Sequence, residues 1–141
     1  MIDFYCDEVL SGKIEVKKVM ETDSVLAYHH TRPSYQSHIV VIPKKHVSSL
    51  IALEDEDNSL LLDLLSVAKT IARQTVTEYG ACRVVTNLGD YQDSKHLHWH
   101  IIYGALEKPK RQLGFLKDKL PPLPNSFFDP LPEEDLKAWG L

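Results

Sequence analysis

The sequence lacks both the long hydrophobic runs of a membrane protein and the cysteine density of a disulfide-rich scaffold. Its most hydrophobic stretches, around residues 59–68 and 39–43, are much shorter than the roughly 20 residues that a membrane-spanning helix needs. Residues 1–12 have no basic segment and no uninterrupted apolar core, so we expect no secretory signal. The two cysteines, Cys6 and Cys82, are therefore predicted to stay reduced in the cytoplasm.

An excess of positive charge is also missing. The 141 residues contain 16 Lys and Arg against 20 Asp and Glu, a net charge of −4. This balance argues against a general binder of nucleic acids or of anionic membranes, although it allows a local phosphate pocket. The length suits one domain, and the 43% of hydrophobic residues can supply a core, which makes a disordered chain an unlikely class.

The pattern of apolar residues predicts an α+β domain with a five-stranded, mainly antiparallel sheet. The expected elements are a short helix over 4–10, strands over 16–20, 25–29, 38–42, 82–87 and about 95–103, and one long helix over 55–79. The long helix has apolar residues at steps of three and four and is followed by Gly80, a residue typical of helix ends.

The composition changes after Gly104. Six of the eight prolines lie in the last 33 residues, which favours an irregular extension, with a short helix possible over 133–139. We therefore expect a domain over 1–104 and a C-terminal extension over 105–141. The aromatic residues of the extension favour its packing on the domain or on a partner subunit; they are Phe115, Phe127, Phe128 and Trp139.

All seven histidines lie in two short windows, 29–46 and 96–100. His96, His98 and His100 alternate with apolar residues, and on a strand this spacing puts three imidazoles on one face, in steps of about 6–7 Å. The intervening residues, Trp99 among them, then face the core.

Two chemistries suit three clustered imidazoles. They could hold a zinc ion with open positions for water, or a neutral imidazole could attack phosphorus as a nucleophile. Asn87, Gln92 and Ser94 are hydrogen-bonding residues suited to phosphate oxygens. Apart from Asp93, no Asp or Glu completes an obvious metal set with these imidazoles.

Four segments in the same order resemble the histidine-triad (HIT) family of nucleotide hydrolases and transferases, in particular its Hint-like members. They are FYCDEV at 4–9, SHIVVIPKKH at 37–46, RVVTN at 83–87 and the His-x-His-x-His run that continues to Ile102. The resemblance implies the HIT fold, a cytoplasmic homodimer with a continuous sheet, and a purine nucleotide or nucleotide conjugate as partner. It implies no cofactor and no metal.

The resemblance also implies roles for individual residues. His98 would be the nucleophile that takes the α-phosphate, His38 would stand behind it in a relay, His96 would hold the site in register, and His100 would contact phosphate and assist the leaving group. Asn87 and Gln92, with Asp93 and Ser94 in the same loop, would face the phosphate. The apolar slot for the base would be formed by Tyr5, Cys6, Val9, Ile14 and Leu26.

Two positions depart from the pattern that the resemblance implies. His30 stands where Hint-like proteins carry an aspartate that grips the ribose hydroxyls, and Asp93 stands where a serine would serve the leaving group. An acid there disfavours a phosphate-rich leaving group and suits an amine, so a nucleotide phosphoramidate hydrolase is the favoured activity. The alternatives are a dinucleoside polyphosphate hydrolase or a nucleotidyl transferase, a nucleotide-binding module with vestigial catalysis, and a zinc-dependent hydrolase.

Cys6 and His46 occupy positions where some HIT proteins hold a structural zinc. The position at which we expect the second cysteine of that site is Val9, so a ligand is missing and no metal is predicted.

Overall fold

The computed structural model describes residues 3–105, 125–130 and 133–138, and the chain divides into two compact units, residues 1–108 and 109–141. The first unit is an α+β domain built on a five-stranded sheet. Its strands are β1 (Lys18–Glu21), β2 (Val25–His29), β3 (Ser37–Pro43), β4 (Arg83–Thr86) and β5 (Trp99–Tyr103). They lie in the order β1-β2-β3-β5-β4, and every neighbouring pair is antiparallel.

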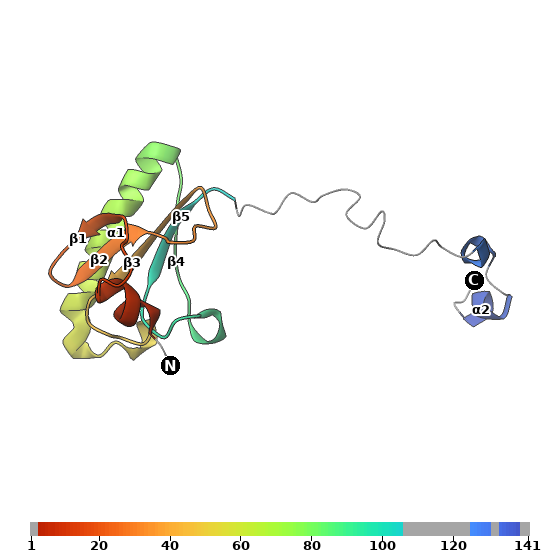
Figure 1. The fold of residues 1–141 in the computed structure, drawn as a ribbon, viewed down its shortest axis with the longest axis horizontal. Helices are drawn as coiled ribbons and strands as arrows, with labels where there is room; N and C mark the ends of the chain where they lie inside the picture. Colours follow the sequence, from red (N-terminus) through yellow and green to blue (C-terminus); the bar gives the residue numbers. More distant parts are fainter. Residues whose placement is uncertain (1–2, 106–124, 131–132, 139–141) are drawn as a thin grey trace. The chain divides into compact units, whose positions relative to one another are not determined.

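The long helix makes the one crossover in this sheet. After β3 the chain passes through two short 3-10 helices, η2 (Leu50–Ala52) and η3 (Asp55–Asp57), into α1 (Asn58–Tyr79). Gly80 ends α1 in the left-handed conformation, with a φ of 85°. The chain then returns as the edge strand β4, and β5 fills the place between β4 and β3 (Figure 1).

The two faces of the sheet carry separate cores because strand side chains alternate. One face contacts α1 through a large cluster that includes Val41, Leu64 and Ile101. The opposite face contacts the N-terminal helix η1 (Tyr5–Leu10) through a smaller cluster, which consists of Tyr5, Val9, Leu26, Tyr28, Val40 and Ile42. This smaller core sits beside the histidines, because Val40 pairs with His100 in the register of β3 and β5.

The structure confirms the predicted fold class and shifts several boundaries. The N-terminal helix has π-helical hydrogen bonding, and the first turn predicted for the long helix is the separate 3-10 turn η3. The last strand begins at Trp99 and not near residue 95. Before it, Leu97 donates its N–H to Val47 (2.6 Å) and Thr86 donates its hydroxyl to the His98 carbonyl (3.0 Å), so these bonds stand in for a regular ladder.

The close approach of two loops requires a glycine at the end of β5. Gly104 has a φ of 89°, and a Cβ added there would lie 2.8 Å from the Cβ of Gln36. Only a residue without a side chain fits this contact, which holds the segment between β2 and β3 against the end of the sheet.

In the second unit the structure describes η5 (Asn125–Phe128) and α2 (Glu133–Ala138), and the latter matches the short helix expected over 133–139. Phe115 and Trp139 lie outside the described residues, and the packing of the 105–141 extension stays a prediction. Among the described residues, no helix combines the length and the apolar character needed to cross a membrane.

Candidate active site

The ring of His98 is held in one tautomer by its own strand. Its Nδ1 lies 2.7 Å from the carbonyl oxygen of His96, and because a carbonyl only accepts, Nδ1 carries the proton. Nε2 is then the nitrogen with a free lone pair, and His98 lines a cavity on the histidine face of the sheet. Burial lowers the pKa of His98, which favours the neutral ring. Nε2 of His98 therefore carries the lone pair that a nucleophile needs.

A separate series of hydrogen bonds holds His38 and His100 in the other tautomer, with the ring proton on Nε2. The backbone N–H of Ser34 donates to His38 Nδ1 (3.3 Å), so the His38 proton lies on Nε2. That atom is 2.9 Å from His100 Nδ1, which leaves the His100 proton on its own Nε2. His100 therefore presents a donor to the same cavity into which His98 presents an acceptor.

This relay is electrically neutral near pH 7. Burial, together with the neighbouring histidines, lowers the pKa of His38 and of His100 to about 4. A neutral relay keeps the two tautomers that the hydrogen bonds select.

His96 is fully buried and does not face the cavity. Its Nε2 lies 3.0 Å from the carbonyl oxygen of Pro43, and its Nδ1 lies 2.9 Å from a carboxylate oxygen of Asp3. Gln92 also helps to hold the backbone at His96, since its side-chain amide donates to the carbonyls of Ser48 (2.6 Å) and His96 (3.2 Å). These contacts position the His96 carbonyl that orients His98.

The cavity has a volume of about 540 Å³, within the range of small-molecule sites. It is lined by Phe4, Tyr5, Ile14, Tyr28, His30, Thr31, Arg32, Asn87, Asp93, Ser94, His98 and His100. The Ser94 hydroxyl oxygen is buried without a hydrogen-bond partner among the described residues, so it is available to a ligand oxygen beside His98. The lining also includes apolar and aromatic side chains, and the Tyr5 ring lies 4.9 Å from the ring of His98 between centroids.

The structure brings most of the predicted site residues together, but not all of them. Gln92 is 4% exposed and donates to backbone carbonyls, so its amide does not reach a phosphate in this cavity. Cys6, Val9 and Leu26 do not line it either. The residues that sequence reasoning missed are Phe4, Tyr28, Thr31 and Arg32; the alternation along β2 from Leu26 through Tyr28 to His30 was a signal for Tyr28.

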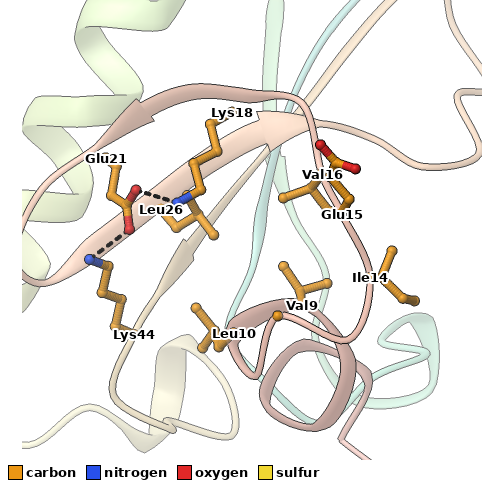
Figure 2. A pocket seen from close by; sticks show the side chains of 10 residues that line it. Val9, Leu10, Ile14, Glu15, Val16, Lys18, Glu21, Leu26 and Lys44 are labelled. Carbon is orange, nitrogen blue, oxygen red and sulfur yellow. Dashed lines mark hydrogen bonds and ion pairs between the residues drawn. The ribbon is translucent and has the colours of Figure 1, made fainter.

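Val9 and Leu26 line a different hollow, of about 660 Å³, which shares Ile14 with the cavity of His98 (Figure 2). Its floor is apolar, and its rim carries Glu21 in ion pairs with Lys18 (2.6 Å) and Lys44 (3.0 Å). No histidine lines it. The residues of the expected base slot are therefore separated: Tyr5 and Ile14 line the cavity of His98, Val9 and Leu26 line the other hollow with Ile14, and Cys6 lines neither.

His96 belongs to a cluster of four potential metal ligands. Asp3, Cys6, His46 and His96 each offer one ligand atom, and these atoms lie within 4.8 Å of one another. One Asp3 oxygen is 2.7 Å from His46 Nδ1, and the Cys6 sulfur is 3.4 Å from His96 Nδ1. Burial and the neighbouring Asp3 raise the pKa of the Cys6 thiol to about 11.

The donor set fits zinc. A tetrahedral zinc holds neighbouring donors about 3.3–3.8 Å apart, so the cluster needs only a slight expansion, and a set of O, S and two N donors is one that zinc accepts. The contact of His96 Nε2 with Pro43 would also orient the ring for binding through Nδ1. The prediction of no metal was based on Val9, which is buried in the core, whereas Asp3 takes the position beside Cys6.

Four protein ligands leave no open position for water, so a zinc ion here would tie η1 to the segments around His46 and His96 and would not act on a substrate.

Comparisons with known proteins identify the family. Residues 11–105 match the HIT domain. An uncharacterized HIT-like protein of Chlamydia muridarum is 31% identical over 101 residues, which cover 71% of this chain and 80% of that protein. The chain belongs to the HIT family.

Solved structures agree with this assignment. A histidine triad protein from Clostridium difficile superimposes with a TM-score of 0.63 at 34% identity, over 77% of this chain and 95% of that one. A HIT family hydrolase from Legionella pneumophila superimposes with a TM-score of 0.66 at 28% identity, over 76% and 96%.

The cluster of four potential ligands that includes His96 predicts stoichiometric metal binding. After dialysis against zinc, elemental analysis should find about one zinc per chain, and the metal should raise the thermal midpoint of unfolding. Asp3→Ala should lower both the zinc content and this gain, because it removes one of four ligands. His29→Ala, at an exposed position outside the cluster, serves as control. Equal zinc content in wild type and Asp3→Ala would contradict the assignment.

The relay predicts a loss of stability on mild acidification. The pKa of His38 and His100 is about 4 in the folded protein and about 6.5 in the unfolded chain, so the unfolded state binds more protons in this window. The stabilisation is complete above about pH 6.5 and is lost as the pH falls towards 4. Urea denaturation at about pH 7 and about pH 5 measures it.

His38→Gln should reduce the stability difference between these two pH values, whereas His29→Gln should retain it. The same difference in both variants would show that the relay is not its source.

Proposed function

We propose that this protein hydrolyses nucleotide phosphoramidates or related nucleotidyl conjugates at the α-phosphate, through a nucleotidyl-histidine intermediate on His98. Membership of the HIT family supports the broader class, a nucleotide-binding hydrolase or transferase. The observation that carries the proposal is the pair of opposite tautomers, with a nucleophilic nitrogen on His98 and a donor on His100 facing one cavity.

In the first step His98 Nε2 attacks the α-phosphorus, a phosphorus–nitrogen bond forms to His98, and the bond from phosphorus to the leaving nitrogen breaks. The leaving nitrogen takes a proton from solvent water and departs as an amine. The His98 ring becomes cationic, and the His96 carbonyl stabilises it through Nδ1–H. His100 Nε2–H and the Ser94 hydroxyl donate to phosphate oxygens as charge develops on them.

In the second step a water molecule attacks the same phosphorus and the bond to His98 Nε2 breaks. The products are a nucleoside monophosphate and neutral His98, and the proton lost by the attacking water returns to solvent. No metal or cofactor takes part in either step.

The base would lie against Phe4, Ile14 and Tyr28, which are aromatic or apolar residues of the cavity lining. Flat aromatic and aliphatic walls of this kind suit a purine. Both cysteines are free thiols, which agrees with a reducing compartment such as the cytoplasm.

Two observations bear on the leaving group. Asp93 lines the cavity beside Ser94, and a carboxylate there favours an amine over a polyphosphate. A smaller cavity of about 260 Å³ shares Asn87 and His100 with the main one and contains Arg83. A cation at that point favours the second candidate, hydrolysis of dinucleoside polyphosphates or transfer of the nucleotidyl group to a phosphate.

Trapping of the intermediate tests the nucleophile. Rapid acid-free quenching during turnover of an adenosine phosphoramidate should give chains heavier by one nucleotidyl group, with the adduct mapped to His98 by mass spectrometry. His98→Ala should abolish the adduct and lower kcat by roughly 10⁴-fold or more, since it removes the attacking atom. His29→Ala should react like wild type.

Turnover without any adduct in wild type, or unchanged turnover in His98→Ala, would refute the mechanism. Running a diadenosine polyphosphate beside the phosphoramidate compares the two leaving groups, and a higher kcat/KM for the polyphosphate would favour the second candidate.

We also propose that two chains pair through the β4 edge, giving one continuous sheet. β4 is an edge strand with an unpaired side, and exposed apolar side chains lie on it and on α1: Leu62, Leu65, Val76 and Val84. Such an edge favours association with a second copy.

Sedimentation should therefore give about twice the chain mass of 16.1 kDa, and Val84→Asp should shift the protein to monomer, because it places a charge at the expected junction. Ile51→Asp, at another exposed apolar position, should remain dimeric. A monomeric wild type at micromolar concentration would contradict this arrangement.

A further inference from the structure

His30 presents a hydrogen-bond donor to the cavity. Its Nδ1 accepts the backbone N–H of Arg32 at 3.0 Å, so the proton of the neutral ring lies on Nε2. The ring is stacked on His38, with centroids 4.2 Å apart and an interplanar angle of 13°, which fixes its plane. Burial lowers the pKa of His30 and so favours this neutral, donating form.

The residues that follow His30 add further donors on the same side. Thr31 and Arg32 line the cavity with it, and Arg32 forms no ion pair within the part of the chain that the structure describes. The segment 30–32 therefore offers an imidazole N–H, a hydroxyl and an unpaired guanidinium, but no carboxylate.

The one carboxylate of the cavity is that of Asp93, which belongs to the loop before His98 and adjoins Ser94. Its charge acts on His98 and Tyr5, at the phosphate end. Negative charge is thus confined to that loop, and positive charge lines the wall formed by residues 30–32.

The order of base, sugar and phosphate in a nucleotide determines which part of it contacts residues 30–32. With the α-phosphate at His98 and the base against Phe4, Ile14 and Tyr28, the sugar would lie between them, where His30 is a further residue of the cavity lining. The ring centroids of His30 and His100 are 6.1 Å apart, a separation that a ribose spans from its 5′ oxygen to its 2′ and 3′ oxygens. A free diol can accept hydrogen bonds from this wall, but the segment 30–32 has no carboxylate to accept the two O–H protons of the diol.

We propose that the nucleotide bound by this site carries a second phosphate, on the 2′ or 3′ oxygen of its ribose, which His30 Nε2–H and the Arg32 guanidinium bind. This inference rests on the proposed function, because it takes the α-phosphate to lie at His98. A phosphate accepts from both groups, and Arg32 supplies the opposite charge, so the phosphate forms a charge-assisted pair that a neutral diol cannot form.

Binding of four nucleotides without a leaving group tests the inference. Isothermal titration would compare AMP, 2′-deoxy-AMP, adenosine 2′,5′-bisphosphate and adenosine 3′,5′-bisphosphate on the full chain. At least one bisphosphate should bind roughly 10-fold more tightly than AMP, as expected for one added charge-assisted contact. 2′-Deoxy-AMP should bind within a factor of about three of AMP, because no carboxylate grips the free hydroxyls.

Two variants and a matched control identify the residues. His30→Asp should invert the preference, since a carboxylate accepts from both free hydroxyls and repels a phosphate. Arg32→Gln should remove most of the bisphosphate advantage and should weaken AMP binding much less than it weakens binding of the bisphosphate. His29→Asp makes the same change of charge one residue away, at an exposed position outside the cavity, and should keep the wild-type preference.

The possible failures are distinguishable. If AMP binds and both bisphosphates bind no more tightly, or if His29→Asp alters the preference as much as His30→Asp, the inference is refuted while the proposed function stands. If wild type binds none of the four nucleotides and forms no adduct on His98, the proposed function is refuted as well.

Discussion

The carbonyl oxygen of His96 is the acceptor on which the site depends. It takes the Nδ1 proton of His98 at 2.7 Å, and without it the choice between the two ring nitrogens of His98 would be open. The oxygen keeps its place because Gln92 donates to it and because the His96 ring is bonded at both nitrogens, to Asp3 and to Pro43. A set of buried contacts with no direct access to the cavity thereby decides which atom of His98 can attack.

The sheet separates stability from chemistry by its two faces. The face toward α1 has a large apolar core, and burial of these side chains stabilises the domain. The opposite face has a small core next to η1 and passes within a few residues into the histidine cavity. One strand, β3, contributes to both, because Val41 faces α1 while His38 and Val40 face the site.

Much of the fold could be predicted because its signals are local. The step pattern of α1, the glycine after it and the alternation along β2 and β3 each depend on a few neighbouring residues. The His-x-His-x-His run likewise indicated the site. What sequence could not supply was orientation: Gln92 has the chemistry of a phosphate ligand, yet it donates to two backbone carbonyls that only the folded chain brings near it. Asp3 escaped notice because its partners lie 43 and 93 residues away.

The absence of a side chain at Gly104 also affects which ring nitrogens of His30 and His38 are protonated. Its close contact with Gln36 holds the segment between β2 and β3, and that segment supplies the Ser34 N–H to His38 and the Arg32 N–H to His30. These two amides assign the ring protons of both imidazoles. A steric constraint at the end of β5 therefore affects which ring nitrogens of His30 and His38 carry protons. Gly104→Ala would disturb this segment and, through it, the acid–base chemistry of two rings that residue 104 does not contact.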